Sequence, residues 1–288
     1  MAAKGMCDPR PFIEALSTDN ITTASNVDIH IAHDGNWPID PKSMPSNVYL
    51  HPCPPSTSIL KLWGVALAKS TGHFTAVLDI HCPPSVGWLQ CALTEIGKDS
   101  ALFFGPVDPG WKKHDQRIVG YLAEYAQFSS PLAIELNEVP GNNLVCQRSL
   151  LGDFEKLQTD GFFKTFMIWR LANEKHLLPT RLNGMIVKYQ KPFRCKHYIA
   201  RRFIHGRCFG ATRHDNDGQP PRLACIGFTF FLPLVRTWRI YKAVQKHHDL
   251  KKSYFRFLIL ILWSECAWSA GELVGYVCGG RAYCNRLD

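Results

Sequence analysis

The chain has 288 residues, of which 46% are hydrophobic, and this content excludes an intrinsically disordered protein. Its formal net charge is +9, and much of the excess lies after residue 188, so we expect a localised basic surface for an anionic partner. The eleven cysteines include no Cys-x-x-Cys pair, which favours reduced thiols in the cytosol over a secreted disulfide framework. The first residues lack the apolar core of a signal peptide, so we expect the folded chain to face the cytoplasm.

The first elements alternate between helix and strand. Residues 9–22 predict a helix with proline at its start, and residues 27–32 (VDIHIA) alternate as a strand. This strand leads into residues 33–36 (HDGN), a composition typical of a turn. Residues 47–50 (NVYL) predict a second short strand.

Residues 59–89 predict a helix, a buried strand, a polar cluster and the start of a second helix. The strand at residues 74–78 (FTAVL) is short, apolar and partly β-branched, as expected of a strand covered on both faces. Asp79, His81 and Cys82 follow it directly. Ligands bind beyond the carboxyl ends of strands in open α/β sheets, so this cluster is a candidate metal or diphosphate site. The alternative is structural, with Asp79 capping a turn and His81 an ordinary polar residue.

Alternation continues along the chain. Residues 88–96 and 114–128 predict helices, the second of them amphipathic. Residues 101–107 and 184–190 predict strands. The order of elements therefore predicts an α/β sheet with helices on its faces.

The segment LAKSTGHFTAVLDIHCPPSVGWL (residues 67–89) resembles the core of the family 2 glycosyltransferases, which transfer a sugar from a nucleotide-sugar donor. LDIHCPP is similar to the branch in which the Asp-x-Asp motif has an acidic-x-His-Cys form. The resemblance implies a glycosyltransferase-A (GT-A) fold, a Rossmann-like mixed sheet flanked by helices. It also implies that Asp79 and His81 hold a divalent metal, Mn²⁺ or Mg²⁺, on the donor diphosphate. An imidazole ligand favours manganese.

The resemblance assigns two more residues to the donor. Asp34 stands where the family has a carboxylate that contacts the nucleotide base, and a carboxylate can accept an imide N–H. Lys61 stands where the family has an arginine that reaches the donor phosphates. The structural alternatives are an Asp-Gly turn and a solvated helix lysine. The family has a strand before its first helix, and none is predicted here, so the chain looks N-terminally truncated and partly degenerate.

Residues 139–148 (VPGNNLVCQR) resemble the Gly-Gly-Asn-Asn loop of the same family. In that loop Gly141 would let the backbone approach the donor sugar, and Asn142 and Asn143 would offer amide groups. The alternative is an ordinary Pro-Gly turn.

Inverting members of the family carry Glu-Asp-x-x-Leu-x-x-Arg-Leu on a helix, where the Asp is the base that deprotonates the acceptor. Residues 163–171 fall on this frame, and Arg170 matches, but Phe163 and Lys164 replace the two acids. An ammonium group is no base at neutral pH unless it is strongly desolvated. Asp160, about one helical turn earlier, is therefore the candidate catalytic residue.

Residues 194–213 predict a basic, aromatic helix that is similar to the post-catalytic helix of the family. Arg207, with Arg201 and Arg202, would clamp a diphosphate or lie on anionic lipid headgroups. The alternative is a solvated basic face. No nucleic-acid partner is expected, because no reader motif accompanies the charge.

A polar linker at residues 214–221 precedes two apolar stretches, 223–235 and 255–278. The first is too short to span a bilayer, and the second contains Glu265 and Glu272, each costing about 2.5–3.5 kcal/mol at a membrane centre. Basic residues between the stretches are a cytoplasmic signature. We expect a helical pair that lies on or dips into the cytoplasmic leaflet, with a soluble helical subdomain as the alternative.

The sequence thus predicts a nucleotide-sugar-binding domain at residues 1–190, lacking its first strand, and a membrane-associated helical segment at 191–288. The predicted function is sugar transfer from a nucleotide-sugar donor to a cell-envelope, polysaccharide or lipid-linked acceptor. The predicted location is the cytoplasmic face of the cell membrane, peripheral or C-terminally anchored. One alternative is a catalytically inactive relative that binds a sugar nucleotide, a lipid or a protein. Another is a zinc-binding structural protein that uses His51, Cys53, His81 and Cys82.

Overall fold

The computed structural model describes residues 1–3, 9–17, 27–35, 44–98, 100–111, 115–133, 138–214, 221–279 and 281–286. The chain forms two compact units. Unit 1 comprises Met1–Gly110 and Ser130–Gln190, and unit 2 comprises Trp111–Ser129 and Lys191–Asp288. The segment Trp111–Ser129, which the sequence analysis placed in the first domain, therefore belongs to the second unit.

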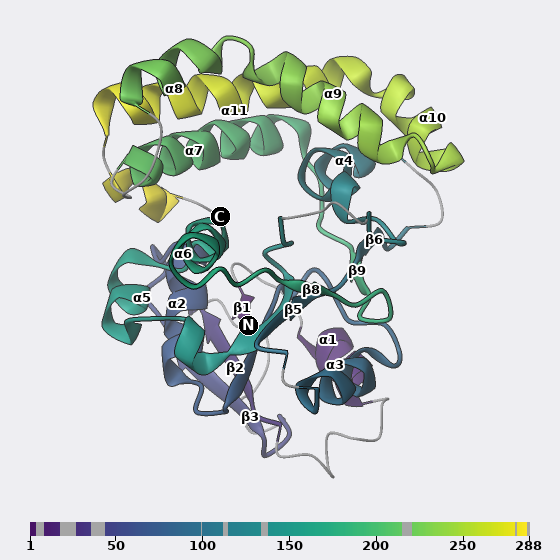
Figure 1. Ribbon diagram of the computed structural model, residues 1–288, viewed down its shortest axis with the longest axis vertical. Coiled ribbons are helices and arrows are strands. Elements are labelled where there is room, and N and C mark those ends of the chain that lie inside the picture. Colours follow the sequence, from purple (N-terminus) through teal and green to yellow (C-terminus); the bar gives the residue numbers. More distant parts are fainter. Residues whose placement is uncertain are drawn as a thin grey trace. The chain divides into compact units, whose positions relative to one another are not determined.

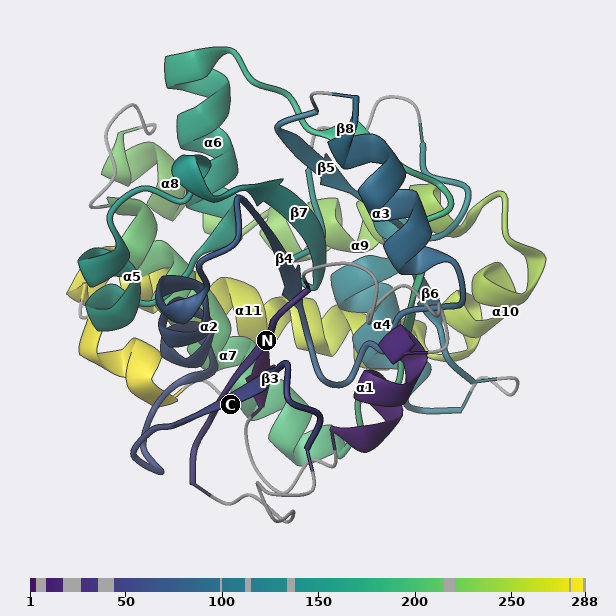
Figure 2. The same cartoon turned by 90° about the horizontal axis from the view of Figure 1, so that it is seen from below.

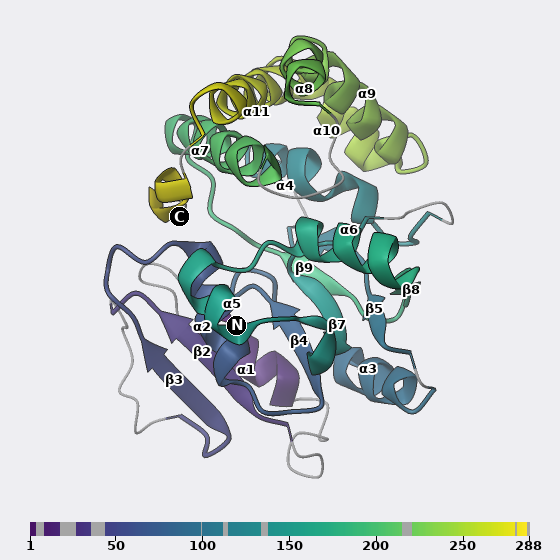
Figure 3. The ribbon, with the colours of Figure 1, turned by 60° about the vertical axis from the view of Figure 1, so that its left-hand side comes forward.

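Unit 1 is built on a mixed sheet. Strands β1 (Ala2–Ala3), β2 (Ile29–His33) and β3 (Val48–Pro52) pair in parallel in the order β1-β2-β3. Strands β4 (Phe74–Leu78), β7 (Asn143–Gln147), β5 (Leu102–Phe104) and β8 (Thr180–Arg181) follow in the order β4-β7-β5-β8 (Figure 3). A parallel bridge between Ala2 and Asp79 joins the two groups. A further parallel pair, β6 (Val107–Pro109) and β9 (Val187–Tyr189), extends the same unit.

Strand β1 corrects one expectation from the sequence. A first strand does precede the first helix, and Ala2 and Ala3 pair with Ala32 and His33 of β2. The prediction failed because two alanines carry no strand periodicity, and only pairing with β2 reveals their role. The predicted fold class, a mixed α/β sheet flanked by helices, is confirmed.

Helices cover both faces of the sheet (Figures 1 and 2). Helices α1 (Arg10–Ser17) and α3 (Trp88–Ile96) lie on one side, and α2 (Ile59–Lys69), α5 (Phe154–Asp160) and α6 (Lys164–Lys175) lie on the other. The predicted end of the first helix, residues 18–22, falls outside the described residues. Helix α2 approaches α5 so closely that a side chain at Gly64 would overlap the carbonyl of Leu157.

Unit 2 is helical. It contains α4 (Ile118–Tyr125), α7 (Cys195–His214), α8 (Arg222–Thr229), α9 (Leu232–Val244), α10 (His248–Arg256) and α11 (Leu258–Cys278). Short 3₁₀ turns at Ala126–Phe128 and Arg281–Arg286 belong to it, and another at Arg148–Leu150 belongs to unit 1. Most of the predicted linker, residues 215–220, lies outside the described residues.

Helices α7 and α11 pack side by side through glycine. A Cβ atom at Gly206 or Gly210 of α7 would overlap the backbone of α11, and one at Gly271 or Gly275 of α11 would overlap the backbone of α7. Both pairs are spaced by four residues, so they lie on one face of each helix. Small residues in this pattern allow two helices to approach backbone to backbone.

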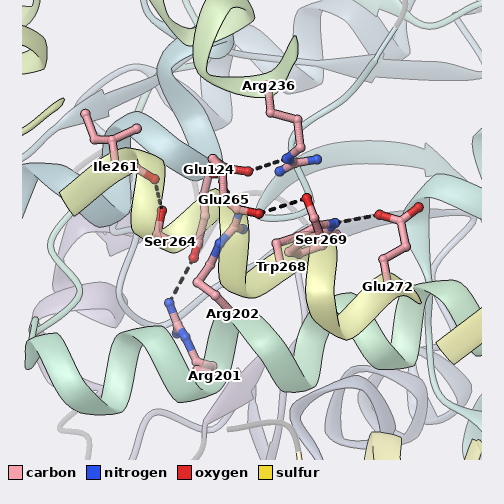
Figure 4. A network of polar contacts seen from close by, with 10 residues as sticks. All are labelled: Glu124, Arg201, Arg202, Arg236, Ile261, Ser264, Glu265, Trp268, Ser269 and Glu272. Atoms are coloured by element: carbon pink, nitrogen blue, oxygen red, sulfur yellow. Dashed lines mark hydrogen bonds and ion pairs between the residues drawn. The ribbon is translucent and has the colours of Figure 1, made fainter. Parts of the chain in front are cut away.

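A network of ion pairs is buried beside these glycines (Figure 4). Arg202 donates to Glu265 at 2.7 Å, and Arg236 pairs with the other oxygen of the same carboxylate. Arg201 pairs with Glu124 at 3.0 Å. The expectation that Arg201 and Arg202 clamp a diphosphate or lipid headgroups is therefore wrong, because both guanidinium groups hold carboxylates within unit 2.

The structure corrects the expectation of reduced thiols at one pair of cysteines, while the eight other cysteines of the described residues are free. Cys208 of α7 and Cys284, which are 76 residues apart in sequence, form a disulfide. Spacing rules such as Cys-x-x-Cys detect local pairs only, whereas this pair is created by the packing of the last turn of the chain against α7.

Candidate functional site

Three polar segments end at the same edge of the sheet in unit 1. His33 and Asp34 follow β2, helix α2 begins after β3, and Asp79 follows β4. Strands β1, β2 and β3 are parallel, and the bridge from Ala2 to Asp79 is parallel too, so these carboxyl ends share one edge. Strand β7 runs the other way, so the residues that begin it join the same edge.

The turn after β4 is tightly organised. One carboxylate oxygen of Asp79 accepts the backbone N–H of His81 at 2.9 Å, and the Asp79 carbonyl accepts the N–H of Cys82. Asp79 is buried and the His81 side chain is half-buried. The His81 carbonyl accepts the N–H of Gln190, which fastens the turn to the end of β9. Asp79 therefore has the turn contact that the structural alternative predicted.

The end of β2 is also buried. Asp34 is 4% exposed. The carbonyl of the neighbouring His33 accepts the N–H of Cys53, the residue that follows β3. Burial lowers the pKa of His33, and the negative charge of Asp34 offsets part of this effect. Gly35 follows with φ of +85°, a backbone conformation that glycine favours. Lys61 lies half-buried in the first turn of α2, which Ser58 caps.

Asn142 and Asn143 are fully buried but have different surroundings. Asn143 accepts a hydrogen bond from Trp88 Nε1 at 2.9 Å and donates to the carbonyls of Pro106 and Met185 at 2.8 and 2.6 Å. Both of its N–H donors are used, so Asn143 fixes three segments of the protein around the site rather than offering an amide to a ligand.

Asn142 donates from Nδ2 to the sulfur of Cys82 at 2.8 Å. Its carboxamide oxygen is buried and has no hydrogen-bond partner among the residues that the structure describes. A buried acceptor in this state costs free energy unless a ligand or water satisfies it. Asn142 is thus a candidate to contact a bound ligand beside the Asp79 turn.

Lys164 is the first residue of α6 and packs over the loop that precedes β7. Its Nζ donates to the carbonyl of Val139, and its side chain lies against the position where Gly141 would carry a Cβ. Desolvation lowers the pKa of Lys164 to about 8, and the charge of Glu138 opposes this shift in part. A Cβ at position 141 would lie about 3.5 Å from the Lys164 side chain, so the lysine packs directly over this part of the loop.

The remaining predicted site residues lie elsewhere. Asp160 is exposed at the last position of α5, where it contacts the neighbouring hydroxyl of Thr159. Arg207 is half-buried in α7 of unit 2. The structure thus gathers Asp34, Asp79, His81, Gly141, Asn142 and Asn143 on one sheet in unit 1, with Lys61 at the start of α2.

The structural zinc alternative is not supported by the geometry. His51 pairs with His30 at 3.0 Å, and Cys82 is held by Asn142. The described part of the chain contains no group of three or more His, Cys, Asp or Glu side chains placed to hold a metal ion. Asp79 and His81 would supply only two ligands, so a divalent ion there would need further ligands from a bound molecule such as a diphosphate.

Two residues of the site have structural contacts that the sequence analysis did not predict. Trp88 holds Asn143, and Cys82 holds Asn142. The Gly-Trp dipeptide at 87–88 was a visible signal for the first. Nothing in the sequence signals that the Cys82 thiol meets Asn142 60 residues away.

No family model of known sequences matches this chain, and no curated protein matches it. Solved structures do. The chain is similar to a mannosyltransferase from Pyrobaculum calidifontis, solved with GDP-Man and Mn²⁺, with a TM-score of 0.53 and 14% identity over 96% of this chain and 86% of that one. It is also similar to TarS 1–349 of S. aureus with UDP-GlcNAc, with a TM-score of 0.48 and 12% identity over 96% and 91% of the two chains. The similarity to the mannosyltransferase shows a GT-A-like fold.

Proposed function

We propose that this chain transfers a sugar from a nucleotide-sugar donor bound at the carboxyl edge of the unit 1 sheet. The observation that carries the proposal is the meeting of Asp34, the Asp79 turn and the buried oxygen of Asn142 at that edge, on a glycosyltransferase fold. The likeness to the branch with an acidic-x-His-Cys motif supports the same function.

Each residue then has a role. Asp34 accepts the imide N–H of the nucleotide base, and Lys61 supplies positive charge for the phosphates. Asp79 and His81 hold a divalent ion, Mn²⁺ or Mg²⁺, which would neutralise the leaving diphosphate. Asn142, beside Gly141, receives a hydroxyl of the donor sugar. Asn143 fixes the loop.

The base that deprotonates the acceptor hydroxyl is either Asp160 or Lys164. An aspartate base is active well below neutral pH, because its ordinary pKa is about 4. An amine base is active only once it has lost its proton, so activity through Lys164 would rise through a pH of about 8. The rate of transfer between pH 5 and pH 9, compared in Asp160→Asn and Lys164→Met proteins, separates the two.

A second candidate function is donor binding without transfer. The observation that favours it is Lys164, which stands at the sequence position of the family's catalytic carboxylate. Its ammonium group donates to the carbonyl of Val139, and a protonated amine cannot act as the base. In that case a nucleotide-sugar binds in the presence of metal and no acceptor is modified.

The acceptor is a cell-envelope saccharide or a lipid-linked saccharide, and the reaction takes place at the cytoplasmic face of the membrane. The basic residues of α9 and α10 support this side. Reducing compartments keep thiols free, so the state of the Cys208–Cys284 disulfide in cells tests this side. Alkylation of the protein in cells, with and without prior reduction, measures that state, and a persistent disulfide contradicts the cytoplasmic face.

Calorimetric titration of UDP and GDP, with and without Mn²⁺, tests the donor site. We expect metal-dependent binding by the unaltered chain and its loss in Asp79→Asn. The matched control is Glu155→Gln, which alters an exposed carboxylate on α5 of the same unit. Equal binding by Asp79→Asn and the control, or no binding of either nucleotide by the unaltered chain, contradicts the proposal.

A further inference from the structure

We infer that α8, α9 and α11 present one apolar face that enters a single leaflet of an anionic lipid bilayer, with the helices in the plane of the membrane. This face would serve the membrane location in the proposed function. Its test does not depend on sugar transfer, so either proposal can fail without the other.

Helix α11 has its polarity inverted relative to a helix of a water-soluble protein. Its exposed side carries Ile259, Trp263 and Val277, which are 86%, 67% and 55% exposed. Its buried side carries Glu265 and Glu272, which are almost completely buried. In water a helix buries its apolar stripe and exposes its charges. The arrangement in α11 is favoured where the medium outside the exposed stripe is itself apolar.

The carboxylates on the buried side are fully provided with partners. Glu265 pairs with Arg202 and Arg236, and Glu272 accepts a hydrogen bond from Trp268 at 2.9 Å (Figure 4). Glu272 also accepts a hydrogen bond from Tyr276 at 2.7 Å. The two glutamates that argued against membrane entry therefore face α7 and not lipid. Their charges are compensated within unit 2, and the objection raised by the sequence does not apply to this face.

Helices α8 and α9 continue the apolar face. They meet at an angle of 70°, and the residues at and beside this bend are large, apolar and exposed. These residues are Phe228, Phe230, Phe231 and Leu234. With 8 and 13 residues, the two helices are only about 12 and 20 Å long, which is less than a bilayer core. Two helices that are too short to cross the bilayer, with aromatic residues at the bend between them, are suited to entering one leaflet.

Positive charge lies where this face ends. Beyond Trp238, helix α9 becomes basic, and Lys242 stacks its ammonium on that indole at 5.2 Å. Lys246 and Lys252 follow and are exposed, and Asp249 is an exposed acid between them. Tryptophan with lysine is typical of the boundary between acyl chains and headgroups. The net positive charge at this boundary selects anionic lipids as the occupant of the face.

The orientation follows from α7. This helix covers the polar side of α11 and contains five Lys or Arg residues, so it does not cross a bilayer. By its length α11 could span a bilayer. Because it packs along α7, however, one side of α11 faces α7 and the other faces lipid. Both ends of α11 are then on the same side of the membrane.

Vesicle sedimentation tests the face with the full chain. We expect binding to vesicles of phosphatidylcholine with roughly 30% phosphatidylglycerol to exceed binding to pure phosphatidylcholine by about tenfold. Phe230→Glu with Trp263→Glu should reduce binding to both vesicles by at least about tenfold, since charges enter the leaflet. Lys246→Glu with Lys252→Glu should reduce binding to the anionic vesicles only.

Leu178→Glu is the matched control, because Leu178 is an equally exposed leucine in unit 1. It should bind vesicles as the unaltered chain does. All the altered positions are exposed, so circular dichroism should show unchanged folding. The inference is overturned if the unaltered chain stays in the supernatant, or if Phe230→Glu with Trp263→Glu sediments like the control. It is also overturned if these substitutions only dissociate a dimer in solution, since the face would then cover a second copy.

Labelling with a membrane-impermeant maleimide tests the in-plane orientation. Lys252→Cys lies before α11 and Asn285→Cys lies after it, and both positions are exposed. On protein bound to sealed vesicles, site-resolved mass spectrometry should find both cysteines labelled from outside. Protection of one of the two would show that α11 crosses the bilayer and would overturn the orientation.

Discussion

The carboxamide of Asn142 donates to the sulfur of Cys82 at 2.8 Å, so the loop that leads into β7 is fastened to the turn that follows β4. This contact leaves the other end of the amide, Oδ1, buried and without a protein partner among the described residues. The Asn142 side chain thus joins the two polar segments of the candidate site, and its Oδ1 atom can still accept a hydrogen bond from a ligand.

Asn142→Ala should weaken binding of the nucleotide-sugar by about tenfold, because one hydrogen bond to the sugar is worth about 1.5 kcal/mol at most. Binding of the nucleotide alone should be unchanged, since Asn142 is assigned to the sugar. Calorimetry with both ligands makes the comparison. Equal weakening of both, or of neither, would contradict the assigned role.

Asn143→Ala should lower the free energy of unfolding by about 2–4 kcal/mol, because Trp88 and two buried carbonyls lose their partner. Denaturant unfolding measures the change. Gln90→Ala is a suitable control, since this amide is exposed on α3 and contacts only Thr94 of its own helix. A loss below about 0.5 kcal/mol at Asn143 would show that water replaces these bonds.

Lys164 predicts a rise in stability at alkaline pH. Its pKa is about 8 in the folded chain and about 10.5 when unfolded, so between these values the unfolded state binds more protons. Stability therefore increases as pH rises through this window. Lys164→Met should lack this increase.

The measurement is the free energy of unfolding at pH 7 and pH 9.5 for both proteins. The change in the unaltered chain minus the change in Lys164→Met isolates the lysine from other groups. An identical pH dependence in the two proteins would mean that the ammonium is solvated in the folded state.

Gly271→Ala should destabilise unit 2 by more than about 2 kcal/mol, because the new methyl group overlaps the carbonyl of Phe203 on α7. Gly227→Ala is the matched control on α8, where a Cβ meets no atom within 4 Å. There alanine should be neutral or stabilising by up to about 1 kcal/mol, because it is the better helix former. Thermal unfolding compares the two, and similar midpoints would show that α7 and α11 are not packed through glycine.

The sequence by itself determined the alternation of helices and strands in unit 1 and the position of the polar cluster after β4. These are local features, since hydrophobic periodicity and turn residues act over a few positions. It also indicated that Asp34 and Asp79 follow strands and that Asn142 precedes one, whereas the shared sheet edge depends on the antiparallel direction of β7, which only the structure shows. The resemblance to glycosyltransferases rested on such local motifs, and the fold agrees with it.

Only the tertiary structure decided what the charged residues do. Arg201 and Arg202 looked like ligands for phosphate, yet they neutralise Glu124 and Glu265. Ala2 and Ala3 became a strand only through pairing with β2, and Cys208 found Cys284 across 76 residues. The physical reason is the same in each case. The partner of each of these residues is fixed by packing between segments that are distant in sequence. Composition and local spacing do not show which distant segments come together in space.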